Sequence, residues 1–409
     1  VVKSASRTDS TDVITSWLTP SPTIVTTRIV TMVSTSVNPD SDETLSSSLA
    51  RTRGRPDLLI GSFTNRRMEK QPMESAARII GTGSAFPERR MTNDDIAQEL
   101  TRFGLKTDNQ WIIDRTGIIE RRISNIQNPA ETNSSLGARA AEIALERAGR
   151  KPEDIDQIIY ATCSPDTLMP STACWLQQKI GARRAWAMDI NAACSGFIYG
   201  VVTAEQFILS GYSKTVLVVG AEVLSQLVNW HDRTICILFG DGAGAAVVQR
   251  AAARSSRRIL SSYLSSDGNL SNLLYIPAGG SNLEVTPERY EQNLHKMHMN
   301  GRELFKVAVR TLAECALRTL EKMHMPAVKL DWLVPHQANL RILEAVANRI
   351  GFPMEKMIVN LDRFGNTSAA TIPTALDEAI RDGRIQKGQT VLTDAFGSGL
   401  TAGAMLFRW

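Results

Sequence analysis

The stretch Met188-Asp-Ile-Asn-Ala-Ala-Cys-Ser-Gly196 runs from a short apolar strand pattern into a helix start built of small residues. The second half of the chain repeats this arrangement in Ile358-Val-Asn-Leu-Asp-Arg-Phe-Gly-Asn-Thr-Ser368. Two similar halves predict a pseudo-twofold core at the centre of the fold. We expect Cys194 and Asn366 to occupy equivalent helix starts in that core and to face one another across the axis.

Alternating strand and helix patterns extend outward from these two stretches and begin at Ala77. Short apolar runs predict strands at 78–81, 158–162, 185–190, 216–220, 243–248, 332–334, 357–360, 390–393 and 402–407. Apolar residues three and four positions apart predict helices at 134–148, 196–209, 303–322, 340–350 and 369–380. This alternation is typical of an α/β protein with a mainly parallel, buried sheet.

The composition is that of a globular protein, because 43% of the 409 residues are hydrophobic and 22% are charged. No apolar run approaches the roughly 18 residues of a membrane span. A net charge of +4 is too small to indicate nucleic-acid binding, although a local basic patch for an acidic protein stays open. The five cysteines lack the CxxC spacing of a metal site, which predicts reduced thiols in a cytoplasmic protein.

Residues 1–72 differ from the rest of the chain, since Ser and Thr account for 24 of them and no apolar period is sustained. We expect a low-complexity, disordered extension. A transit peptide is a second interpretation, which the acidic residues between positions 9 and 43 disfavour. A third is an over-long reading frame with a true start at Met68 or Met73. The remainder divides into the two halves of the repeat, 73–250 and 251–409.

Three polar side chains stand where strands give way to helices. Cys194 would meet unpaired N–H groups and the positive end of a helix dipole, which lower a thiol's pKa and favour a nucleophile. His336 follows a strand at the edge of the sheet where α/β active sites gather. Each has an ordinary alternative: a free cysteine is usually a buried hydrophobe, a lone loop histidine is usually structural, and Asn366 could be only a helix N-cap.

Together these segments resemble the Cys-His-Asn active site of the thiolase superfamily, and specifically of the β-ketoacyl-[acyl-carrier-protein] synthase III family. The resemblance spans roughly residues 76–409 and includes Trp111-Ile-Ile-Asp-Arg-Thr-Gly-Ile118 and Phe239-Gly-Asp-Gly-Ala-Gly-Ala245. Each motif alone is weak, whereas the set in family order is specific. It implies a thiolase-like α/β fold, with two pseudo-symmetric halves in a layered α-β-α-β-α sandwich.

The resemblance implies decarboxylative condensation of a short acyl-CoA, such as acetyl-CoA, with malonyl-ACP. The product would be 3-oxoacyl-ACP, which initiates type II fatty acid biosynthesis. Cys194 would carry the acyl group, while His336 and Asn366 would donate hydrogen bonds to the malonyl thioester. The backbone N–H groups of Cys194 and Ser398 would form the oxyanion hole, although the family commonly has glycine at the second position. No cofactor is implied, because acyl-CoA and malonyl-ACP are substrates.

The resemblance also implies roles for individual binding positions. Without it, a surface arginine would be interpreted as a solvated side chain and a single tryptophan as part of the core. The positions matched to CoA contacts are Trp111, Arg115, Arg233, Arg302, Ala338 and Asn339. Arg302 stands where the family often has asparagine. The positions matched to the acyl carrier protein are Lys306, Arg341 and Arg349. Met169 matches a residue that closes the acyl pocket of a partner subunit, which implies a homodimer.

Two other interpretations stay open. A secondary-metabolic condensing enzyme or acyltransferase of the same superfamily would use the same triad with a different acceptor. A catalytically inactive acyl-binding subunit would be expected to lack the nucleophile or the histidine, and both Cys194 and His336 are present.

Overall fold

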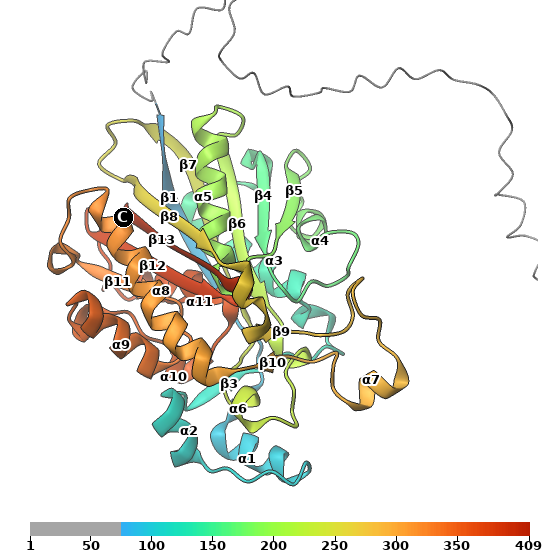
Figure 1. The fold of residues 1–409 in the computed structure, drawn as a ribbon. Helices are drawn as coiled ribbons and strands as arrows, with labels where there is room; N and C mark the ends of the chain where they lie inside the picture. The colour runs from blue at the N-terminus through green and yellow to red at the C-terminus, as the bar shows by residue number, and fades with distance from the viewer. Residues whose placement is uncertain (1–74) are drawn as a thin grey trace, which may run out of the picture. The chain divides into compact units, whose positions relative to one another are not determined.

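Two mixed sheets form the frame of residues 75–409, which are the residues that the structure, a computed structural model, describes (Figure 1). The extension expected at 1–72 lies outside the described residues. The first sheet has the order β1 (Ser75–Ala85), β7 (Gly242–Ala252), β6 (Thr215–Glu222), β4 (Gln157–Ala161) and β5 (Trp186–Ile190). The second has the order β11 (Trp332–Pro335), β12 (Thr390–Gly397), β13 (Thr401–Arg408) and β8 (Arg258–Ser266).

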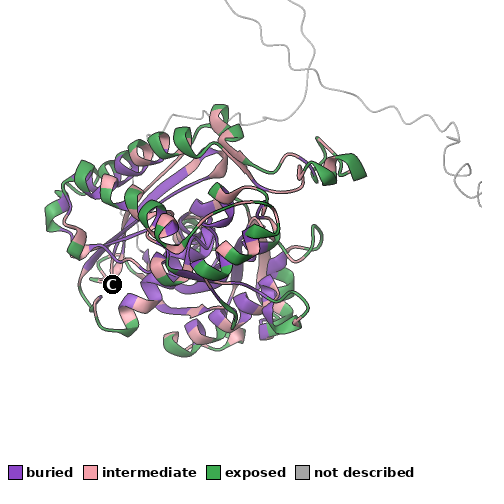
Figure 2. Ribbon diagram, turned by 90° about the horizontal axis from the view of Figure 1, so that it is seen from below, coloured by how far each residue is buried: buried purple, intermediate pink, exposed green. Residues whose placement is uncertain are grey.

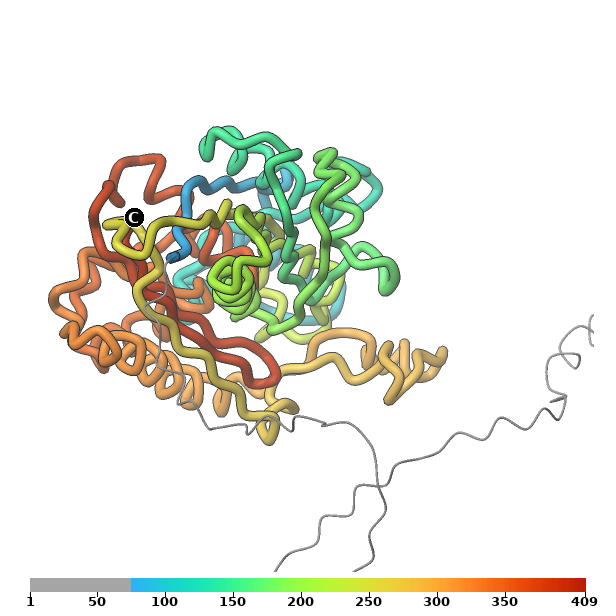
Figure 3. The backbone as a smooth tube through the Cα atoms, turned by 90° about the horizontal axis from the view of Figure 1, so that it is seen from above, coloured from blue at the N-terminus to red at the C-terminus, as the bar shows by residue number. Residues whose placement is uncertain are grey.

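The two sheets repeat one topology. In the first, β4 pairs in parallel with β6, and β6 pairs antiparallel with β7. In the second, β11 pairs in parallel with β12, and β12 pairs antiparallel with β13. In Figure 3 most of the green part of the chain lies to the right and most of the orange-to-red part lies to the left, so the two sheets sit in different parts of the molecule.

Six helices cover the faces of these sheets. The outer face of the first sheet packs against α3 (Asn133–Ala148) and α4 (Thr172–Ile180). The outer face of the second packs against α8 (Gly301–Glu321) and α9 (Leu340–Ile350). Between the sheets lie α5 (Gly196–Leu209) and α11 (Thr371–Arg381), whose apolar residues share one buried cluster with strands of both sheets. This order confirms the predicted α-β-α-β-α sandwich, and Figure 2 shows the outer helices exposed on one side only.

The central helix α11 lies unusually close to the first sheet. A Cβ atom added at Gly220 in β6 would lie 2.3 Å from the carbonyl oxygen of Ala369. One added at Gly244 in β7 would lie 2.7 Å from Cβ of Pro373. Only glycine permits this approach, because any side chain would push the helix away from the strands.

A buried carboxylate ties the two halves together. Asp377 of α11 accepts hydrogen bonds from Thr82 at 3.0 Å and Ser84 at 2.7 Å, both in β1. It also pairs with Arg147 of α3 and with Arg381 one turn along its own helix. Because only 1% of the Asp377 side chain is exposed, its charge depends on these four donors.

Most of the short elements gather at one end of the sandwich, the lower end in Figure 1. The bounds of the short elements are β2 (Arg90–Thr92), α1 (Asn93–Thr101), α2 (Asn109–Thr116), β3 (Glu120–Arg122), α6 (Arg233–Cys236), β9 (Leu274–Tyr275), α7 (Pro287–Glu291), β10 (His298–Met299) and α10 (Leu361–Phe364). Residues of β2, α1, α2, α6 and β10 contribute to a separate apolar cluster, whereas Leu361 of α10 packs with the second sheet. Across residues 75–409, no helix is both long and apolar enough to cross a membrane.

The strand predicted at 357–360 is wrong. Only a single bridge joins Met357 to Leu333, and the carbonyl oxygen of Ile358 accepts from the side-chain amide of Gln337 at 3.1 Å instead of from another strand. The sequence also failed to indicate β8, which is an edge strand rich in serine and therefore lacks a continuous apolar run.

Candidate active site

Cys194 lies in a tight turn, Ala193–Ser195, that joins β5 to α5. Ala193 has a φ of +44°, in the left-handed region, and its N–H donates to Oδ1 of Asn191 at 3.2 Å. Gly397 packs against the same turn, where an added Cβ would lie 2.7 Å from the backbone nitrogen of Cys194. The thiol is therefore held in one place at the start of a central helix, and the residue is only 6% exposed.

A second turn of the same shape precedes α11. Ser368 has a φ of +50°, and its N–H donates to Oδ1 of Asn366 at 2.8 Å. Asn366 is therefore the repeat counterpart of Asn191, and Ala369 is the counterpart of Cys194. Cys194 and Asn366 therefore lie at equivalent helix starts, as expected, although they are not residue-by-residue counterparts, because the strained residues Ala193 and Ser368 set the alignment of the two turns. Since its oxygen is engaged, Asn366 has the Nδ2 group left to offer as a donor.

His336 follows the last residue of β11 and is 3% exposed. Its backbone N–H donates to the carbonyl of Asp394 in β12 at 2.8 Å, and its Nδ1 lies 2.7 Å from the hydroxyl of Thr371 at the start of α11. Gln337, which is fully buried, fixes the next turn of the chain. Its amide donates to the carbonyl of Pro335 at 2.8 Å and accepts the N–H of Asn360 at 3.0 Å.

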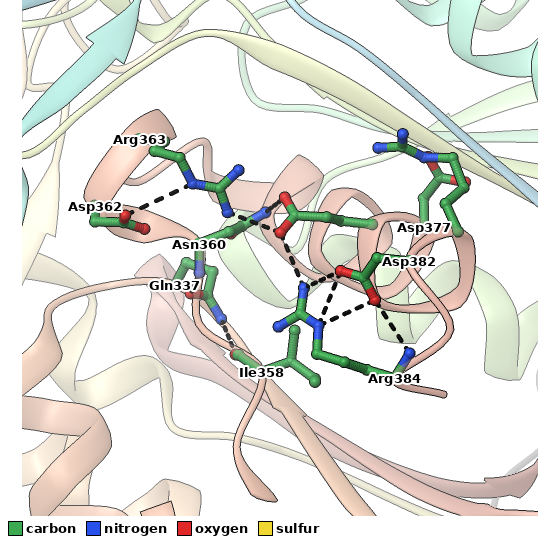
Figure 4. Close-up of polar contacts among 10 residues, drawn as sticks. Gln337, Ile358, Asn360, Asp362, Arg363, Asp377, Asp382 and Arg384 are labelled. Atoms are coloured by element: carbon green, nitrogen blue, oxygen red, sulfur yellow. Dashed lines mark hydrogen bonds and ion pairs between the residues drawn. The ribbon is translucent and has the colours of Figure 1, made fainter. Parts of the chain in front are cut away.

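The Gln337 bonds connect the histidine turn to the segment that leads to Asn366. Figure 4 shows Gln337 beside Ile358, with Asn360 above it. Farther out, Glu378 accepts from Arg363 at 2.7 Å and from Arg384 at 3.0 Å. Gln337 thus holds the loop before α10 in the core, and the ion pair of Arg363 with Glu378 holds α10 itself near the surface.

The three side chains meet in one cavity of about 550 Å³, lined by Cys194, His336 and Asn366 together. Matched binding positions also line it, and these are Trp111, Arg115, Arg302, Lys306, Ala338, Asn339 and Arg341. Phe239 and Phe396 contribute apolar wall. A buried, largely apolar cavity that brings together a thiol, an imidazole and a carboxamide is suited to acyl transfer.

Trp111 of α2 carries two guanidinium groups over its ring. The Cζ atoms of Arg115 and Arg233 lie 4.0 Å and 4.7 Å from the ring centroid. Asn339, the N-cap of α9, donates to the backbone carbonyl of Arg115 at 2.8 Å and so joins α9 to α2. A flat ring beside two cations can bind a nucleotide by stacking and by phosphate pairing.

Comparison with known proteins agrees with this geometry. Models of the family 3-oxoacyl-[acyl-carrier-protein] synthase III match residues 188–268 and, for its C-terminal part, residues 320–409. The chain is 48% identical over 334 residues to the β-ketoacyl-[acyl-carrier-protein] synthase III of Caldanaerobacter subterraneus, which covers 82% of this chain and 98% of that protein. The chain belongs to the β-ketoacyl-[acyl-carrier-protein] synthase III family.

Solved structures of related proteins also resemble this chain in fold. The crystal structure of 3-oxoacyl-[acyl-carrier-protein] synthase III from Aquifex aeolicus matches with a TM-score of 0.74 at 43% identity, covering 81% of this chain and all of that one. The priming β-ketosynthase of the R1128 polyketide pathway matches with a TM-score of 0.74 at 31% identity, covering 83% of this chain and 98% of that one. The predicted family and thiolase-like fold are confirmed.

A second cavity of about 430 Å³ shares Cys194 with the first. Ser398, the predicted oxyanion residue of this β-ketoacyl-ACP synthase III relative, lines it, and its hydroxyl donates to the carbonyl of Leu274. Cys163 lines it too, with its thiol 3.3 Å from Oε1 of the buried Glu222. Sequence reasoning gave Cys163 no role and missed Glu222, Gln337 and Thr371, because none stands in a pattern that indicates chemistry.

Three of the matched positions lie outside both cavities. Arg233 reaches the site only through the ring of Trp111. Arg349 is exposed in the last turn of α9. Met169 is 87% exposed in a loop beside Leu168, which is 93% exposed. Within the described residues, no group of three His, Cys, Asp or Glu side chains is placed to hold a metal ion.

Burial sets the charge state of the site. It raises the pKa of the Cys194 thiol to about 12, although the nearby polar side chain of Ser368 opposes the change. It lowers the pKa of His336 to about 3. The expected lowering of the thiol pKa at the helix start is therefore wrong, because desolvation outweighs the N–H groups and the dipole. The free enzyme holds a neutral thiol and a neutral imidazole.

Alkylation of the free enzyme by iodoacetamide tests this charge state. The thiolate fraction falls about tenfold for each pH unit below the pKa, so labelling of Cys194 is expected to keep rising from about pH 6 to about pH 10. Mass spectrometry of digested samples would measure it, with the exposed Cys174 as an internal check on the reagent. A rate that is already constant below about pH 7 would indicate a thiolate–imidazolium pair and contradict the assignment.

Proposed function

We propose that this chain transfers a short acyl group, such as acetyl, from acyl-CoA to malonyl-ACP with loss of carbon dioxide, and so forms 3-oxoacyl-ACP. This reaction would initiate type II fatty acid synthesis in the cytoplasm. One observation carries the proposal: Cys194, His336 and Asn366 line a single cavity in a member of the β-ketoacyl-ACP synthase III family.

In the first half-reaction the Cys194 sulfur loses its proton and attacks the thioester carbonyl. The S–C bond to the acyl group forms, and CoA departs with its sulfur and a proton. The backbone N–H groups of Cys194 and Ser398 stabilise the oxyanion of the tetrahedral intermediate. The approach of Gly397 to the Cys194 nitrogen supports this assignment, because it brings the two backbone segments together.

In the second half-reaction the malonyl thioester oxygen accepts hydrogen bonds from His336 Nε2 and Asn366 Nδ2. The C–C bond to the carboxylate breaks and carbon dioxide leaves. The electron pair of that bond stays on the malonyl carbon and forms an enolate, which the two donors stabilise. The enolate carbon then attacks the acyl-cysteine carbonyl, and Cys194 leaves as thiolate and recovers a proton. Neutral donors at the buried end of the cavity suit this step, because His336 and Asn366 are at most 7% exposed and can stabilise the enolate oxygen with little competition from water.

The cavity entrance supports CoA binding. Trp111 would stack on the adenine, with Arg115 and Arg233 beside the phosphates, and Ala338 and Asn339 would line the pantetheine path. Arg302 lines the same cavity and would contact the CoA there, at the position where the family often has asparagine.

The carrier protein would dock at the same entrance. Lys306 and Arg341 line its rim and are exposed, and Arg349 lies two turns farther along α9. Three cations on one face would attract an acidic partner. A homodimer is also proposed, in which the exposed Met169 enters the acyl pocket of the partner subunit.

Two variants separate the half-reactions. Cys194→Ser is expected to abolish the acyl-enzyme, because the serine hydroxyl is a much weaker nucleophile. Asn366→Ala is expected to acylate within about threefold of wild type but to lose about 10²-fold to 10³-fold in condensation, the usual cost of one lost donor. Intact-protein mass spectrometry would measure acylation, and 3-oxoacyl-ACP and carbon dioxide would report condensation.

Asn366→Asp is the matched control for the loop. A carboxylate still accepts the N–H of Ser368 but cannot donate, so it separates the missing donor from a displaced turn. Condensation is expected to stay blocked in this variant. Condensation at the wild-type rate in Asn366→Ala and Asn366→Asp would refute the assigned role of Asn366.

Reversing one charge tests the docking surface. Arg341→Glu is expected to raise KM for malonyl-ACP by about tenfold at low salt while leaving acylation by acyl-CoA nearly unchanged, because rim charges act mainly on encounter. The difference should shrink as salt is added. Arg310→Glu, an exposed arginine of α8 that does not line the cavity, is the control. Equal losses in both half-reactions would count against the surface.

A second candidate is a condensing enzyme of secondary metabolism. The likeness to the R1128 priming β-ketosynthase favours it, since the fold and the family are shared. A panel of acyl-CoAs with malonyl-ACP from fatty acid and polyketide systems distinguishes the two by the preferred pair. An inactive acyl-binding subunit is disfavoured, because the thiol, imidazole and carboxamide are all present in one cavity.

A further inference from the structure

The hydroxyl of Thr371 lies between two acceptors. Its Oγ1 is 2.7 Å from Nδ1 of His336 and 2.8 Å from the carbonyl oxygen of Ser368. All three residues are at most 3% exposed, so no bulk water completes their hydrogen bonding. A hydroxyl has one proton, and the acceptor that receives it determines which nitrogen of the imidazole carries the ring proton.

The carbonyl of Ser368 has a second donor. The backbone N–H of Thr371 already donates to it, as expected at the start of a helix. Among the described residues, Nδ1 of His336 has the Thr371 hydroxyl as its one hydrogen-bond partner. Because the carbonyl of Ser368 already has this donor, the hydroxyl proton is free to face Nδ1. A second arrangement, in which Nδ1–H donates to Oγ1 and the hydroxyl donates to the carbonyl, also satisfies every acceptor, so the chemistry of the site decides between the two.

The chemistry requires the arrangement in which the hydroxyl proton faces Nδ1. Burial keeps the imidazole neutral, so the ring carries a single proton. To donate to a thioester oxygen in the cavity, that proton must be on Nε2, and Nδ1 must then be the acceptor. This step rests on the proposed function, in which His336 is a donor during condensation.

We infer that Thr371 is a positioning residue that donates to Nδ1 of His336 and thereby fixes the ring as the Nε2–H tautomer, ready to donate to the malonyl thioester. It acts through the histidine and does not touch the substrate. The backbone N–H of Thr371 donates to the carbonyl of Ser368, whose own N–H holds the carboxamide of Asn366, so the residue contacts both turns of the site.

Three variants on one helix test this role. Thr371→Val removes the hydroxyl at nearly constant volume and is expected to slow condensation by about tenfold or more while acylation stays within about threefold, as loss of an orienting bond predicts. Thr371→Ser should restore condensation. Thr374→Val is the matched control, because Thr374 is equally buried and its hydroxyl bonds only the carbonyls of Ala370 and Thr371.

The half-reactions are measured separately. Acyl-enzyme formation is followed by intact mass, and condensation is followed in a single turnover after acylation has gone to completion. Thermal unfolding of each variant monitors folding. Equal loss in both half-reactions, loss in Thr374→Val as large as in Thr371→Val, or no loss at all would overturn the inference.

The tautomer can also be read without substrate. In ¹⁵N-histidine-labelled free enzyme, with His336→Ala to assign the signal, the inference expects a protonated Nε2 and an unprotonated Nδ1. A protonated Nδ1 in the wild-type protein would overturn it. Failure of the proposed function would appear differently, as wild-type enzyme that forms no 3-oxoacyl-ACP whatever its tautomer.

Discussion

The insertion of two helices back to back between two sheets is the constraint from which the site follows. Because α5 and α11 occupy one central layer, their first turns are brought to the same end of the sandwich. Gly220 and Gly244 permit this by removing side chains where α11 meets the strands, and Asp377 fixes the helix to β1. Residues far apart in sequence can then line one cavity.

The same central position removes the site from water. Desolvation makes both reacting groups neutral, since it raises the pKa of Cys194 and lowers that of His336. A neutral imidazole is a poor electrostatic partner for a thiolate but a good hydrogen-bond donor where no water competes. The environment thus favours the enolate-forming step, and the bonds from Thr371 and Ser368 determine which atoms can donate.

Much of this architecture could be predicted from sequence, because buried strands and amphipathic helices leave strong periodic patterns. The bounds of α5 and α9 and the layered order were correct. The pKa of Cys194 could not be predicted in the same way, because the sequence indicates the field at a helix start but not how deeply the thiol is buried. The two equivalent helix starts were recognised, but the residue-by-residue alignment depends on the left-handed backbone at Ala193 and Ser368, which the sequence does not reveal. Thr371 and Gln337 act through contacts that exist only after folding.

The proposed reaction requires that CoA extend along one path, from the ring of Trp111 to the sulfur of Cys194. A crystal structure of the protein with bound CoA tests that path most directly. We expect the adenine on Trp111 beside Arg115 and Arg233, and the CoA sulfur within about 4 Å of the Cys194 sulfur, the range of direct contact. A CoA bound elsewhere, or one whose sulfur remains outside the cavity, would contradict the account.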